Sequence, residues 1–350
     1  MVSIPAAVVK YRYPLDSIRL FRLNYAYLSP PGFTRGPYRR KTGDMTEQLS
    51  LFQTSDTRPA EGPGAADLVL QEADGSALDE LFRLSRRWGR NCDYLELLEF
   101  IARFPAYSPL NCFLIHLQDP AATQVATARM WLRKCQRRIK AGARPIAILA
   151  PMSPVLFVFD VRDTEGPALL TGAFKAAADR LPVKPYEATL HNCGIQHIAV
   201  REAAASSIPA EGTVRVTPAI RKKHPELSLE PNTRYLVLIE TGLSLEEKYA
   251  ALVLELGHLF CGHLGIDGDA WWADRKNLNL ERIDIEAASA AHLVCRRRGL
   301  AQAGSRFLAA CREADRELPS FSLSAVFQAV THIEAMGKTT WSKPRKHGRY

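Results

Sequence analysis

The chain has 350 residues, of which 47% are hydrophobic and 24% charged, and its formal net charge is +9. This composition is ordinary for a globular protein with its own core. No run of 18 or more apolar residues occurs, which argues against a membrane span and a membrane partner. The seven cysteines include no CxxC pair, which excludes a disulfide scaffold or a cysteine zinc site and indicates a reduced, cytoplasmic protein.

The positive charge is clustered. Residues 1–41 hold eight Lys or Arg against one acid, and residues 129–144 hold seven basic residues and no acid. A basic tail at 338–350 adds further cations. Such clusters suggest an anionic partner, most often nucleic acid, although a solvated basic face is the alternative.

Residues 1–75 are expected to form a flexible basic leader, because Pro and Gly interrupt it at 30–32 and 59–64. Met45 lies within the leader and is an alternative start of the protein.

A short apolar motif follows Met45. Gln48, Leu49, Leu51 and Phe52 belong to the pentapeptide QLSLF, which resembles the peptide by which bacterial DNA-repair proteins bind the sliding clamp. A glutamine and two or three apolar anchors can fill a hydrophobic groove while their flanks stay disordered. The alternatives are a chance apolar pentamer or the first turn of a docked helix.

The first half of the chain beyond the leader predicts helices followed by two strands. Three-and-four spacing of apolar residues predicts a helical block at 77–104, which Pro105 ends. Further helices are expected at 111–117 and 126–140, and strands at 145–150 and 155–159.

The second half predicts a helix at 173–181 and three short strands. The strands are expected at 197–200, 213–216 and 235–240. Ser244 and Glu247 match a capping box, so a helix should run from about 245 to 264. Two more helices are expected at 284–298 and 323–336.

The helix that begins after Ser244 carries an incomplete zinc motif. In HExxH, two histidines four apart bind one zinc ion, and the glutamate activates the metal-bound water. Glu255 and His258 occupy the glutamate and second-histidine places, but Leu254 stands in the first. Leucine has no donor atom, so one ligand is lost.

The sequence LELGHLFCGHLG, followed by DGDAWWADR and DIEAASAAHLVCRRRGL, resembles the ImmA/IrrE family of zinc metallo-endopeptidases. The resemblance covers about residues 230–337. It implies that Glu255 is the general base and that His258 and Glu286 are zinc ligands. Because Leu254 departs from the pattern, zinc is expected to bind weakly or not at all, and Leu254→His is expected to restore binding.

Three other side chains are candidates for a substitute ligand, namely Cys261, His263 and His292. With such a ligand the protein would be an active zinc endopeptidase that cleaves a regulatory protein. His263 is otherwise expected to be structural.

Residues 80–165 resemble the single-stranded-DNA-binding N-terminal domain of ArdC-type antirestriction proteins, which pair it with a metallopeptidase-like domain. The resemblance rests on YSPLN at 107–111, on 126–131 and on 139–149. Phosphates attract cations and unstacked bases need aromatic faces. The predicted DNA-binding residues are Tyr107, Arg129, Trp131, Arg133, Arg137 and Lys140. Alternatively, Trp131 packs the helix onto a sheet.

Together these patterns predict an α+β protein: an ArdC-N-like α/β module at 76–170, then a zincin-like domain at 171–337 with a small sheet and several helices. The expected function is that of a DNA-associated pseudo-enzyme of antirestriction or mobile-element type.

Overall fold

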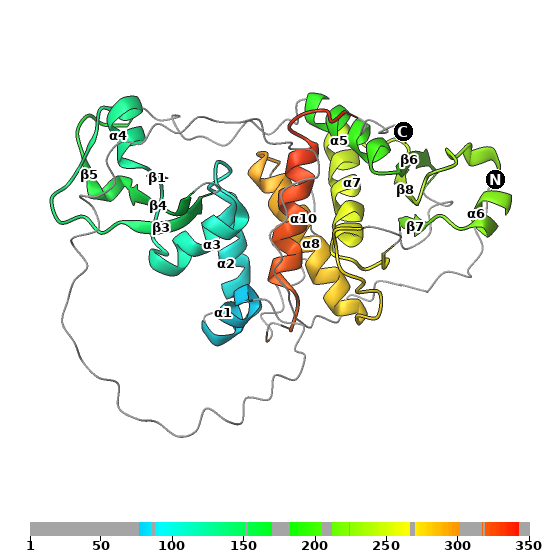
Figure 1. The fold of residues 1–350 in the computed structure, drawn as a ribbon, viewed down its shortest axis with the longest axis horizontal. Coiled ribbons are helices and arrows are strands. Elements are labelled where there is room, and N and C mark those ends of the chain that lie inside the picture. The colour runs from blue at the N-terminus through cyan, green and yellow to red at the C-terminus, as the bar shows by residue number, and fades with distance from the viewer. Residues whose placement is uncertain are drawn as a thin grey trace, which may run out of the picture. The chain divides into compact units, whose positions relative to one another are not determined.

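The computed structural model describes residues 77–85, 88–150, 153–169, 183–204, 212–223, 225–266, 270–300, 317 and 319–342. Within these residues the fold is mixed α+β, as the sequence predicts, with nine α-helices and three small sheets (Figure 1). The leader, its QLSLF motif and most of the basic tail lie outside the described residues. No helix of the described part combines the length and the apolar character that crossing a bilayer requires.

The predicted helical block at 77–104 is two helices, α1 (Ala77–Ser85) and α2 (Asn91–Ala102). The break includes Gly89, whose backbone freedom disfavours a helix. α3 (Pro109–Gln118) begins at Ser108, whose hydroxyl accepts a hydrogen bond from Asn111 N, with proline in the first turn.

The first sheet has the order β1-β4-β3, with β1 (Val125–Ala126), β3 (Ile146–Ala150) and β4 (Ser153–Asp160). β3 and β4 are antiparallel, and Ile146 is opposite Val158. The outer edge of β3 is covered by α3, because the side-chain amides of Asn111 and Gln118 bond the backbone of Leu149 and Ala147. Pairing of this kind protects an edge strand from other chains.

The predicted helix at 126–140 is much shorter in the structure. α4 spans Ala128–Cys135, because Thr127 caps its start and Gln136 adopts the left-handed conformation (φ 53°). The chain then enters β2 (Arg138–Ile139), which pairs with β5 (Thr164–Glu165) beyond the short 3-10 helix η2 (Val161–Asp163). Arg137 and Lys140, which the sequence placed in this helix, therefore lie beyond its end.

The second sheet has the order β6-β8-β7 and matches the three predicted strands. β8 (Tyr235–Glu240) is central, parallel to β6 (Ile198–Ala203) and antiparallel to β7 (Thr213–Arg215). Before β6 lies α5 (Val183–Ile195), which the sequence did not predict, and the predicted helix at 173–181 falls outside the described residues. α6 (Pro218–Lys223) and η4 (Pro225–Leu227) connect β7 to β8.

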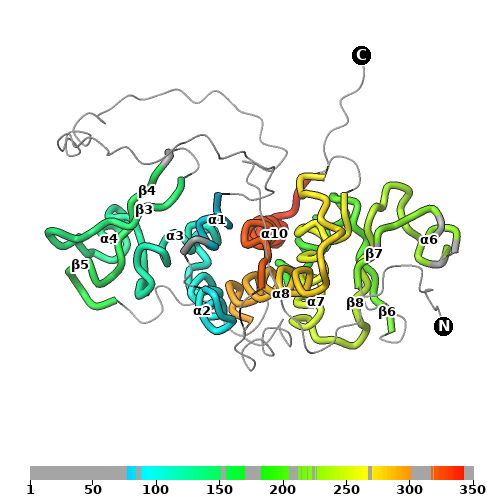
Figure 2. Tube along the Cα trace, turned by 90° about the horizontal axis from the view of Figure 1, so that it is seen from below, coloured from blue at the N-terminus to red at the C-terminus, as the bar shows by residue number. Residues whose placement is uncertain are grey.

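Three long helices carry the core: α7 (Leu245–Phe260), α8 (Leu280–Arg297) and α10 (Leu323–Met336). The capping box of Ser244 and Glu247 is present as predicted. α8 contacts both α7 and α10 and also packs on α2 (Figures 1 and 2).

The buried residues of α1–α3 belong to the same hydrophobic cluster as those of α7, α8 and α10. Arg297 of α8 links the two parts, since its guanidinium donates to the carbonyl oxygens of Ile101, Phe104 and Tyr107 and pairs with Glu334. The core therefore crosses the domain boundary that the sequence predicted at residue 170.

Candidate metal centre

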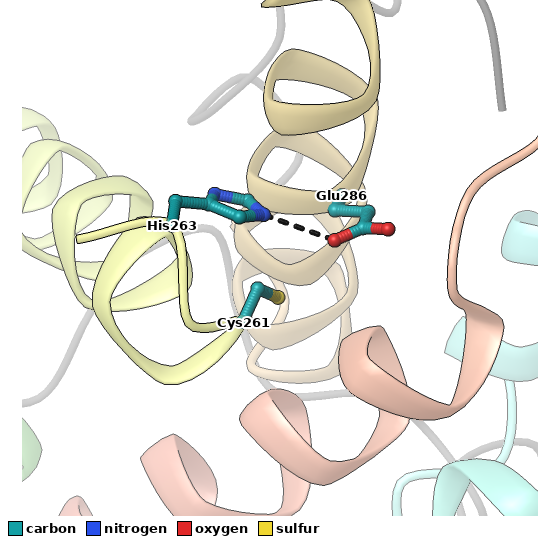
Figure 3. Close-up of side chains that lie close together, drawn as sticks. All are labelled: Cys261, His263 and Glu286. Atoms are coloured by element: carbon teal, nitrogen blue, oxygen red, sulfur yellow. Dashed lines mark hydrogen bonds and ion pairs between the residues drawn. The ribbon is translucent and has the colours of Figure 1, made fainter. Parts of the chain in front are cut away.

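The candidate site lies where α7 ends beside α8. α7 ends at Phe260 because Gly262 has φ 82°, and a Cβ there would collide with the carbonyl oxygen of Ala273. This turn brings Cys261 and His263 to the side of α8 that carries Glu286 (Figure 3). All three residues are buried.

The carboxylate of Glu286 is fully engaged by donors from three directions. Arg275 binds it in a fork, with Nη1 2.6 Å from Oε2 and Nη2 2.7 Å from Oε1. His263 Nε2 lies 2.9 Å from Oε2, and the backbone N–H of Ser322 donates to Oε1 at 2.6 Å. A carboxylate has about four acceptor positions, so this one has none left.

The two histidines continue this network. His263 Nδ1 is 3.2 Å from His258 Nδ1. Since His263 donates through Nε2 to Glu286, its Nδ1 accepts in the neutral ring, and His258 donates through its own Nδ1. His258 is then left with an unprotonated Nε2.

Burial and charge keep both rings neutral. Burial, reinforced by neighbouring His263, lowers the pKa of His258 to about 3, and burial also lowers the pKa of His263. Burial alone would raise the pKa of Glu286, but Arg275 and the bond from His263 outweigh it, so this pKa is lowered and the group is ionised. The site is a neutral unit built on an arginine–glutamate pair.

The ligand atoms of Cys261, His263 and Glu286 lie within 4.8 Å of one another, and in the described part of the chain they form the one group of three that could hold a metal ion. Cys, His and carboxylate are zinc ligands. The surroundings do not fit a metal, however, because a dication would have to displace Arg275 from Glu286. The Arg275 guanidinium also donates to the carbonyl oxygen of Cys261, which fixes this cation in the site.

The structure does not join His258 and Glu286, the two predicted zinc ligands, in one site. The ring of His263 lies between them and bonds to both. Leu254 is half-buried and packs against the core. His292, a predicted substitute ligand, faces Glu99 of α2, 3.3 Å from its carboxylate.

Glu255, the predicted general base, is held on the second sheet. Its Oε2 accepts a hydrogen bond of 2.6 Å from the hydroxyl of Thr213 on β7. Gly212, the residue before Thr213, has φ 47°, and a Cβ at Gly212 would collide with the Glu255 carboxylate. Glu255 is therefore packed against a strand edge.

The predicted DNA-binding residues divide into two groups. Arg129 and Arg133 are exposed, as a phosphate contact requires; Lys140 is exposed too, but its Nζ donates to the carbonyl oxygen of Arg162. Arg137 instead bonds Thr164 and the carbonyl oxygen of Gly166, which fixes the β2–β5 turn.

The predicted aromatic contacts are structural. The Trp131 ring is wholly buried and donates to the carbonyl oxygen of Phe159 at 2.8 Å, so it cannot stack on a base and the alternative, packing on a sheet, describes it. Tyr107 donates to the carbonyl oxygen of Val125 and packs against the core.

Comparison with family models, curated proteins and solved structures gave no match to this chain. Sequence reasoning gave no role to Arg275, although it ends the quoted segment DGDAWWADR, or to Thr213; the two reach Glu286 and Glu255 only through the fold.

Proposed function

We propose that the protein is a nucleic-acid-binding pseudo-enzyme: an ImmA/IrrE-like metallopeptidase domain without a working zinc site, joined to a DNA-binding module. The observation that carries the loss of catalysis is the fork of Arg275 on Glu286. The guanidinium supplies the positive charge that a zinc ion would supply, so the carboxylate needs no metal.

Support for nucleic acid comes from the charges around α4. Between residues 109 and 169 there are eight Lys or Arg and four acids. Arg129, Arg133, Lys134, Arg138 and Arg144 are exposed, and none makes an ion pair with another described residue. Unpaired cations of this kind bind phosphates and release counterions.

Binding of a fluorescent fifteen-residue oligo-dT tests this function. The triple variant Arg129→Glu, Arg133→Glu and Arg138→Glu should bind at least tenfold more weakly, and the slope of log affinity against log salt should become shallower by about 2, since each single-strand phosphate contact contributes about −0.7.

The matched control reverses three exposed cations elsewhere, Arg201, Lys222 and Lys338, and changes the net charge equally. This control should bind like the unmodified protein. Equal weakening in both triple variants would reduce the effect to net charge and refute a binding site at α4.

A second candidate function is an active metallopeptidase with a substituted ligand set. The grouping of Cys261, His263 and Glu286 favours it. This candidate requires Arg275 to leave Glu286 when metal enters, and it predicts a bound zinc ion that the first candidate excludes. The protein substrate and a sliding-clamp partner for residues 48–52 remain proposals from the sequence.

A further inference from the structure

Exposed apolar side chains gather in the module that carries the cations. Nine large hydrophobic residues are exposed in the described part of the chain, and six of them lie between residues 130 and 157. These six are Met130, Leu132, Leu149, Val155, Leu156 and Phe157. A cluster of this kind marks a contact surface more often than isolated exposed residues do.

Phe157 is, together with Leu132, the most exposed of these six residues. It lies in β4 beside Val158, which is fully buried, and alternate residues of a strand face opposite sides of the sheet. The Phe157 side chain is 53% exposed, and Val155, two residues away on the same face, is 42% exposed. The residue opposite Phe157 on β3 is Ala147, too small to cover an aromatic ring.

α4, which carries Arg129 and Arg133, is bonded to the strand that carries Phe157. Trp131 Nε1 bonds the carbonyl oxygen of Phe159, two residues from Phe157 along β4, a separation of about 7 Å. Arg129 and Arg133 lie two residues to either side of Trp131, so at 100° per residue they project roughly opposite to its buried ring. Arg144, also exposed, lies two residues before β3.

We propose that the outer face of the β3–β4 hairpin is where single-stranded DNA is held, with an unpaired base stacked on Phe157 and the backbone phosphates near Arg129 and Arg133. This inference rests on the proposed nucleic-acid function and names its contact surface. A polyanion with flat apolar faces complements both parts of the surface, whereas an apolar protein partner would leave the cations unmatched. A duplex hides its base faces, so only a single strand can use the ring.

Substitutions at Phe157 in the full-length protein test the proposal, again with fluorescent oligo-dT of fifteen residues. Phe157→Ala should weaken binding about 5- to 150-fold, the range for losing one stacked base, while Phe157→Trp should bind as well or better. Phe157→Leu keeps an apolar side chain without a π-face and should behave like alanine. Binding of a duplex of the same length should stay unchanged in all three variants.

The charge-reversal variant distinguishes failure of this proposal from failure of the proposed nucleic-acid-binding function. If Phe157→Ala binds oligo-dT normally while reversal of Arg129, Arg133 and Arg138 abolishes binding, the stacking surface is refuted and the nucleic-acid function stands. If neither change matters, both are refuted. The same face could instead bind a second copy of the chain, which sedimentation measures. A dimer that Phe157→Ala turns into a monomer would assign the face to that second copy and overturn the proposal.

Discussion

At the scale of single residues, Arg275 occupies the carboxylate that a metal ion would need. Arg275 is half-buried, but its guanidinium forks onto a carboxylate with no exposure to solvent. Replacing one partner of such a buried pair leaves the other charge without compensation.

Arg275→Met should therefore lower the free energy of unfolding by about 3 kcal/mol or more, because Glu286 stays buried and unpaired. Glu286→Gln added to this variant should recover part of the loss. Urea unfolding measures the free energy of unfolding of the single and the double variant. The control is Lys276→Met, which removes only the pair with exposed Asp274 and should cost under about 1 kcal/mol. A loss no larger in Arg275→Met than in this control would contradict the assignment.

A second residue makes stability depend on pH. Asp79 is buried on α1 and accepts one long bond from Ser324 N, and burial raises its pKa to about 9 from 3.8. The folded protein thus holds a proton that the unfolded chain releases above about pH 4. This group's contribution to stability is largest below that pH and falls as pH rises toward 9.

Asp79→Asn should remove this dependence. Between pH 5.5 and pH 8 we expect the free energy of unfolding of the unmodified protein to fall by at least about 1 kcal/mol relative to the variant. Each pH unit in this window changes it by up to about 1.4 kcal/mol. Urea unfolding at both pH values measures it, with exposed Glu96→Gln of α2 as control. Parallel pH profiles for Asp79→Asn and the unmodified protein would show that Asp79 is ionised in the fold.

Residue roles were predictable only where the signal is local. The capping box of Ser244 depends on neighbours three residues apart, and the structure confirms it. The partners of Glu255 and Glu286 come from residues 42 and 11 positions away, so no spacing rule could find them. Trp131 among arginines looked like a stacking residue, but the fold buries it, and exposed Phe157 lies in a strand that reads as core.

At the scale of elements, the sequence predicted β3, β4 and the three strands of the second sheet, together with α10, because their apolar runs are compact and their ends well marked. Two features were missed for physical reasons. α4 ends at a non-glycine residue in the left-handed region, Gln136, which no composition rule marks. α5 contains Pro185 and Gly194, both poor helix formers, but the proline lies in the first turn where it is tolerated.

Packing between elements also decides which fragments can fold. α1–α3 share a core with α8 and α10, and Phe82, Trp88 and Phe113 form ring contacts within it. A fragment of residues 171–350 should therefore expose apolar surface and lack fixed tertiary structure, while residues 76–350 should unfold in one cooperative transition. Near-ultraviolet circular dichroism and urea unfolding distinguish them. A well-folded 171–350 fragment would contradict this expectation and support the domain boundary predicted at residue 170.

At the scale of the whole molecule, the described residues divide into a cation-rich module around the first sheet and a helical core that holds the Arg275–Glu286 pair. The first is proposed to bind an anionic strand, and in the second the carboxylate of Glu286 is held by Arg275. The sequence alone predicted one missing zinc ligand, at Leu254. It predicted that a histidine there would restore zinc binding, whereas the engaged state of Glu286 implies that Leu254→His alone remains metal-free.

Metal content of the purified full-length protein, measured by plasma mass spectrometry after exposure to excess zinc and gel filtration, tests this central claim most directly. We expect well under one zinc per chain in the unmodified protein and in Leu254→His, and a gain only when Arg275→Ala is added to Leu254→His. One zinc per unmodified chain, lost on Cys261→Ser or on His263→Ala, would contradict the claim and establish the substituted metal site instead.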